Sequence, residues 1–112
     1  MGKQYVPQRG DLVWLNFNPQ AGYEQSGKRP AVVLSPIDYN KKVGLIICCP
    51  ITSQSKGYPF EVEIPVGVKI SGVILADQVK SMDCEIREVE FIDKLPHEIL
   101  NEVIQKLAVL LQ

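Results

Sequence analysis

Four clusters of polar residues stand at the ends of apolar segments that are predicted to be strands. They comprise residues 16–18, 24–29, 52–56 and 77–80. If these loops meet at one rim of the fold, they bring together a guanidinium, ammonium groups, a carboxylate, hydroxyls and amides. Arginine offers a planar fork of donors that matches phosphate oxygens, and its charge does not titrate near neutral pH. The inventory therefore favours a site for a phosphodiester.

Other side chains of these loops suit a single-stranded nucleic acid. Phe17 or Tyr58 can stack on an unpaired base. Hydroxyls and amides that can donate to phosphate or bind base edges occur at Asn16, Gln25, Thr52, Ser53, Gln54 and Gln78. From the residues alone, simpler roles stay open: Arg29 as an ion-pair partner of Glu24, Thr52 as an ordinary strand residue and Phe17 as a core residue.

Neither a metal ion nor a cofactor is expected. A magnesium-dependent nuclease normally clusters two or more carboxylates, whereas these loops offer mainly Glu24 and Asp77. The three cysteines lack CxxC spacing, and the one histidine, His97, is predicted to lie on the surface of a helix. Cys48 and Cys49 are adjacent in a strand, so they should point to opposite faces as small packing residues.

Composition describes an ordinary globular chain. With 112 residues, 46% hydrophobic and 22% charged, residues 1–112 are expected to form a single domain. We find no apolar run that could cross a membrane and no signal-peptide pattern, which favours the cytoplasm. The net charge of −1 divides unevenly: residues 1–60 hold seven basic and three acidic residues, whereas residues 61–112 hold five and ten. An anionic ligand should therefore dock on the first half.

The elements that must position these residues are short strands followed by one helix. Apolar alternation or apolar runs predict strands within residues 9–19, 30–35, 45–52, 60–65, 72–79 and 85–93. Residues 20–29 are predicted to be a long functional loop, residues 37–44 a turn, and residues 95–112 an amphipathic helix with Pro96 in its first turn. The fold class is then mainly β with a C-terminal helix, as a small barrel of five to seven strands. Pro30 restricts Arg29 to an extended conformation where loop meets strand.

Four stretches in register resemble the MazF (PemK-like) family of toxin endoribonucleases from bacterial type II toxin–antitoxin systems. They are GDLVWLNFNP, EQSGKRPAVVLS, ITSQSKGYPFEV and GVILADQVKSMD. The resemblance covers nearly the whole chain. It implies an SH3-like, CcdB-type barrel that acts as a homodimer, cuts single-stranded RNA at short sequences without metal, and is inhibited by a cognate MazE-like antitoxin.

The resemblance also assigns roles to individual residues. The family's catalytic arginine and threonine match Arg29 and Thr52, and its acidic loop residue matches Glu24. Its RNA-binding positions match Asn16, Phe17, Lys28, Ser53, Lys56, Asp77 and Gln78. Asn16 and Asn18 stand where relatives are often acidic, which bears on nucleotide preference.

The implied reaction is attack of a ribose 2′-OH on its own 3′ phosphate. It leaves a 2′,3′-cyclic phosphate, or a 3′-phosphate once this is opened, and a 5′-OH end. Arg29 would stabilise charge on the phosphorane oxygens, Thr52 would donate to a nonbridging oxygen, and Glu24 would orient Arg29 or act as base. Two alternatives from other classes are a CcdB-like DNA gyrase poison and a non-catalytic SH3-like binding module.

Overall fold

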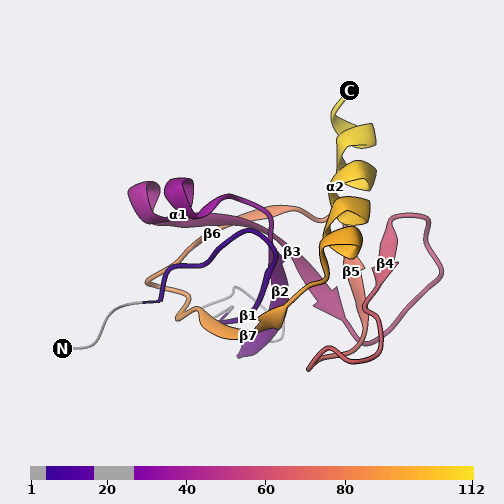
Figure 1. Ribbon diagram of the computed structural model, residues 1–112, viewed down its shortest axis with the longest axis horizontal. Coiled ribbons are helices and arrows are strands. Elements are labelled where there is room, and N and C mark those ends of the chain that lie inside the picture. Colours follow the sequence, from indigo (N-terminus) through magenta and orange to yellow (C-terminus); the bar gives the residue numbers. More distant parts are fainter. Residues whose placement is uncertain (1–4, 17–26) are drawn as a thin grey trace, which may run out of the picture.

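The computed structural model describes residues 5–16 and 27–112, which form seven strands and two helices (Figure 1). In chain order these are β1 (Asp11–Asn16), β2 (Lys28–Val33), α1 (Ile37–Val43), β3 (Leu45–Thr52), β4 (Glu61–Glu63), β5 (Val73–Leu75), β6 (Lys80–Asp83), β7 (Glu90–Lys94) and α2 (His97–Leu111). The predicted class, mainly β with a C-terminal helix, is confirmed.

All seven strands belong to one antiparallel sheet with the order β4–β5–β3–β2–β1–β7, and β6 pairs with β3. One edge of β3 pairs with β2. Its other edge is divided, with β5 beside Ile51 and Thr52 and β6 beside residues 45–48. Within the described residues no pairing joins β4 to β7, so the sheet of the predicted barrel is open. Strands β4 and β7 are the two ends of the strand order among the described residues.

Each face of the sheet carries its own apolar cluster, because neighbouring residues of a strand point to opposite faces. One cluster, which includes α2, contains Leu12, Val32, Cys49, Ile51, Ile74, Leu100 and Val103 among others. The other contains Val13, Leu15, Ala31, Val33, Ile46, Cys48 and Met82. Cys48 and Cys49 thus fall into different clusters, which confirms their prediction as packing residues on opposite faces.

Helix α2 covers the first of these clusters. Leu100 and Val103 are buried along its inner side, and Trp14 packs against the same cluster. Figure 1 shows the helix rising beside β4 and β5, with its C-terminal end pointing away from the sheet. Pro96 is the N-cap in an extended conformation, so the helix begins at His97 and the prediction of Pro96 in the first turn was wrong by one position. His97 is exposed, as predicted.

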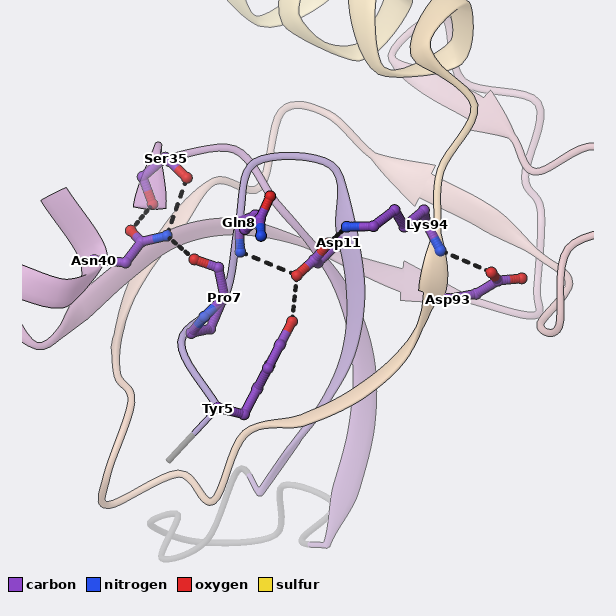
Figure 2. Close-up of polar contacts among 8 residues, drawn as sticks. All are labelled: Tyr5, Pro7, Gln8, Asp11, Ser35, Asn40, Asp93 and Lys94. Carbon is purple, nitrogen blue, oxygen red and sulfur yellow. Dashed lines mark hydrogen bonds and ion pairs between the residues drawn. The ribbon is translucent and has the colours of Figure 1, made fainter. Parts of the chain in front are cut away.

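The segment after β2 forms a helix, α1, where the sequence had predicted a turn. Asn40, on this helix, is 2% exposed. Its Nδ2 donates to the backbone oxygens of Pro7 (2.8 Å) and Ser35 (3.1 Å), and its Oδ1 accepts from the Ser35 hydroxyl at 2.5 Å (Figure 2). Gly44 ends the helix in the left-handed conformation with φ 81°. The seven-residue helix was missed because it depends on these tertiary hydrogen bonds more than on local periodicity.

A second polar network, built around one buried carboxylate, holds the segment that leads into β1. The Asp11 carboxylate is 1% exposed and accepts hydrogen bonds from the Tyr5 hydroxyl and, at 3.0 Å, from the backbone N–H of Gln8 (Figure 2). Lys94 on β7 completes the network with an ion pair of 2.7 Å. Burial and then the hydrogen bond to Asp11 raise the pKa of Tyr5 above its ordinary value. The network joins residues 5–11 to the neighbouring edge strand, β7.

Two further boundaries differ from the sequence prediction. Strand β2 begins at Lys28, so Lys28 and Arg29 are strand residues and the predicted loop of residues 20–29 was too long at its end. Pro30 is tolerated within the strand, opposite Trp14, because the flanking residues still pair. Strand β6 was missed, since Lys80–Asp83 is short and largely polar.

In the described part of the chain, neither helix is long and apolar enough to span a membrane.

Candidate active site

Arg29 and Thr52 lie at the same end of two adjacent strands. Strands β2 and β3 pair with Ala31 opposite Pro50, and the same register continued for two residues sets Arg29 opposite Thr52. Directly opposed residues of an antiparallel pair project from the same face. Both side chains therefore belong to one face of the sheet, beyond the apolar cluster of Ala31 and Val33. Each is only partly exposed.

The hydroxyl of Thr52 is oriented by the turn that follows it. Its Oγ1 accepts a hydrogen bond of 3.2 Å from the backbone N–H of Gln54. A hydroxyl that accepts one bond in this way can still donate its own hydrogen to an anion. The end of β3 therefore presents an O–H group beside β2, the strand that carries Arg29.

Gly72, which precedes β5, lies close to the backbone of Thr52 on the side opposite β2. Gly72 has φ 128°, and a methyl group placed on it would overlap the carbonyl oxygen of Thr52 and lie 3.1 Å from its carbonyl carbon. The next residue, Val73, pairs directly with Thr52. Sequence reasoning did not select Gly72, and its only local signal is the Ser-Gly pair before a strand.

Lys28 and Asn16 form a neighbouring group on the opposite face. They are paired across β1 and β2, and Lys28 precedes Arg29, so it points away from it. Lys28 makes an ion pair of 2.8 Å with Glu90, and Asn16 Nδ2 donates to Glu88 Oε1 at 3.5 Å. The structure therefore does not bring these two predicted RNA-binding residues onto the face of Arg29.

Asp77 and Gln78 lie on the other edge of β3. They follow β5 in a turn closed by the bond from the Gln78 N–H to the Leu75 oxygen at 3.0 Å, and both are exposed. Asp77 lies close enough to Cys49 to help raise the pKa of that thiol, after burial, to about 12. The turn is thus placed beside the middle of β3 and not beside its Thr52 end.

Ser53 and Lys56 extend from Thr52 into an exposed loop, which we call the β3–β4 loop (residues 53–60). An open hollow of about 720 Å³ separates this loop from residues 64–73. The loop is folded around Glu61, a residue that sequence reasoning did not select. An acidic residue directly after a Gly-containing loop was the available signal.

The remaining predicted residues, Glu24 and Phe17, lie outside the described residues. Among those that are described, no group of three His, Cys, Asp or Glu side chains could hold a metal ion. The described chemistry at the end of β2 and β3 consists of a guanidinium, hydroxyls and an ammonium group. These groups bind anions through hydrogen bonds and charge.

Comparison with known proteins shows similarity over almost the whole chain. Residues 8–111 match the family described as PemK-like, MazF-like toxin of type II toxin–antitoxin system. The endoribonuclease toxin MazF of Escherichia coli K12 is 58% identical over 82 residues, which is 73% of each chain. A crystal structure of MazF from Deinococcus radiodurans superposes with a TM-score of 0.88 at 54% identity, covering 96% of this chain and 98% of that one. A MazE–MazF crystal structure from the same organism gives a TM-score of 0.87 at 48% identity and covers 96% and 97%.

Proposed function

The chain belongs to the family of PemK-like, MazF-like toxins of type II toxin–antitoxin systems, and we propose that this endoribonuclease cuts single-stranded RNA at short sequences without a metal ion. The observation that carries the proposal is that Arg29 and Thr52 lie at the same end of two paired strands. The register of Ala31 with Pro50, continued for two residues, sets them opposite each other on one face. An arginine fork and a hydroxyl on neighbouring strands can contact the same phosphate. The substrate RNA would be met in the cytoplasm.

In the proposed reaction the RNA supplies its own nucleophile. The 2′-OH attacks the adjacent 3′ phosphorus, the bond from phosphorus to the 5′ oxygen breaks, and that oxygen takes a proton to become a 5′-OH. The first product is a 2′,3′-cyclic phosphate, which water can open to a 3′-phosphate. Arg29 stabilises the negative charge that develops on the phosphorane oxygens, and Thr52 donates to one nonbridging oxygen.

Glu24 is proposed either to take the 2′-OH proton or to orient Arg29. The two roles differ in how the reaction rate depends on pH. A base must be ionised, so its loss in Glu24→Gln removes the acid limb of the pH profile of kcat/KM. An orienting residue leaves the limb in place and lowers the rate across the whole range.

The test of the activity uses purified protein, a long single-stranded RNA, the matching DNA and excess EDTA. We expect discrete RNA cuts with 5′-OH ends and intact DNA. Loss of a group that stabilises transition-state charge lowers kcat by about 10²–10³, so Arg29→Ala should fall in that range. Arg29→Lys retains the charge but loses the fork, and wild-type cleavage by this variant would count against bidentate phosphate contact.

A MazE-like antitoxin and a second copy of the chain are the proposed partners. Support for the antitoxin comes from the similar MazF of Deinococcus radiodurans, whose crystal structures include MazE–MazF. The first half of the chain carries a charge of +4, with seven basic against three acidic residues. An acidic antitoxin segment is expected to compete with RNA for this half, and simultaneous binding of both would refute that competition.

A further inference from the structure

The β3–β4 loop is folded around one carboxylate. Both oxygens of Glu61, the first residue of β4, accept hydrogen bonds from the loop that precedes it. Oε1 accepts from the Ser55 hydroxyl at 2.7 Å and from the Gly57 N–H at 3.1 Å, and Oε2 accepts from the Lys56 N–H at 2.9 Å. Three successive residues of an exposed loop are thereby attached to a strand of the sheet.

The arrangement specifically suits an ionised carboxylate. All three partners donate, and only a carboxylate presents two acceptor oxygens without a donor of its own. The Lys56 N–H, followed by the Ser55 hydroxyl, holds the pKa of Glu61 below its ordinary value. The charged form, and with it the clamp, is therefore present above the ordinary glutamate pKa and is lost only as pH falls through the lowered one.

Gly57 allows the loop to close on the carboxylate. Its φ of 74° lies in the left-handed region, and a methyl group placed there would meet no atom within 4 Å. Glycine therefore suits this position because of the backbone conformation, and not because a larger side chain would lack space. The turn then ends in a bond of 3.1 Å from the Glu61 N–H to the Tyr58 oxygen.

We propose that Glu61 is a positioning residue for RNA binding, which holds the β3–β4 loop so that Ser53 and Lys56 are presented beside Thr52. The proposal rests on the proposed ribonuclease function. Glu61 is proposed to act through the loop and not to contact the reacting phosphate. It lowers the entropy that an exposed loop would lose on binding, so its loss weakens the binding of RNA and leaves the chemical step intact.

The test compares Glu61→Gln with Glu63→Gln. Glu63 lies two residues along the same strand and on the same face, and within the described residues it makes no hydrogen bond to the loop. Both variants remove one negative charge, so a difference between them reports the hydrogen bonds. Ser55→Ala, which deletes one of the three bonds, is a milder variant that preserves the carboxylate.

Two readouts are needed. The first is the rate at which trypsin cuts the folded protein after Lys56, mapped by mass spectrometry. The second is KM and kcat for a short RNA that spans a cut site first mapped with the wild-type protein. We expect Glu61→Gln to speed cutting after Lys56 several-fold and to raise KM about tenfold, as for loss of a charge-assisted contact, with kcat within about twofold. Ser55→Ala should raise KM about two- to threefold, and Glu63→Gln should match the wild type.

Other results would overturn the proposal. An equal rise in KM for Glu61→Gln and Glu63→Gln would show that charge alone matters. Faster proteolysis without a change in KM would show that the clamp does not serve RNA, and a loss confined to kcat would place Glu61 in the chemistry. Absence of RNA cleavage by the wild-type protein would instead refute the ribonuclease function on which the inference rests, while the proteolysis comparison would still test the clamp.

Discussion

Replacing Gly72 by alanine should disturb the protein through two separable effects. The first is backbone strain, since φ 128° is a conformation that residues with a Cβ rarely adopt, and such strain costs about 1–3 kcal/mol. The second is overlap with the carbonyl group of Thr52, which is held in the β3–β5 pair and cannot easily withdraw. Overpacking of this kind costs about 1–3 kcal/mol. Gly72→Ala should therefore lower the free energy of unfolding by about 2–6 kcal/mol.

Gly67→Ala is the matched control. Gly67 also has a positive φ, of 104°, but a methyl group placed on it would meet no atom within 4 Å. Gly67→Ala should therefore lower the free energy of unfolding only by the strain contribution, about 1–3 kcal/mol. Urea unfolding monitored by circular dichroism gives both free energies. At about 4 °C per kcal/mol for a domain of this size, the two melting temperatures should differ by about 4–12 °C.

The same pair of variants separates stability from activity. Measured where both proteins are folded, Gly72→Ala should reduce kcat for RNA cleavage because the overlap displaces Thr52, whereas Gly67→Ala should not. Equal losses of stability in the two variants would refute the reasoning, since the contact with Thr52 would then add nothing. Wild-type kcat in a destabilised Gly72→Ala protein would show that the position of Thr52 is not critical.

Three further predictions concern polar and ionisable groups outside the candidate site. The raised pKa of Tyr5 means that the folded protein keeps the phenol proton while the unfolded chain loses it near pH 10, so stability should fall as pH rises above about 10. Tyr5→Phe should flatten that fall in urea titrations from pH 8 to pH 11, and an unchanged slope would refute it. Asn40→Ala should destabilise by about 2–4 kcal/mol, because two backbone oxygens lose their donor; a urea midpoint equal to wild type would contradict this. Burial raises the pKa of all three cysteine thiols, to about 12 for Cys48 and Cys49, but Cys84 alone is half-buried and not fully buried. Iodoacetamide at pH 8 should therefore modify Cys84 first, and equal labelling of all three in mass spectra would count against the packing.

The sequence was sufficient for features that depend on periodicity and on residue type. Alternation in residues 60–65 predicted that one face of β4 is solvent-exposed and the other buried, and the spacing of apolar residues predicted the amphipathic helix α2. The adjacent cysteines of β3 were correctly assigned to opposite faces for the same reason, because the strand period admits no other arrangement.

Features that depend on contacts between distant residues could not be predicted in this way. Helix α1 is held by Asn40 through hydrogen bonds to Pro7 and Ser35, and a seven-residue segment has little helical preference without such bonds. Strand β6 is polar in sequence and is a strand because the edge of β3 accepts it. Likewise, Glu61 and Gly72 act on residues of other segments, so nothing in their immediate neighbours distinguishes them.

The candidate site differs from the sequence prediction mainly in how its cations are divided. Lys28 and Arg29 are adjacent in sequence, and both were predicted to serve the same RNA site. In a strand they point to opposite faces, and Lys28 is paired with Glu90 on β7. Under the proposed function, a phosphate held by Arg29 would therefore not share its charge with Lys28. Lys56 follows Thr52 in the β3–β4 loop and is the cation that remains to be tested for this role, and its loop is held by the hydrogen bonds to Glu61.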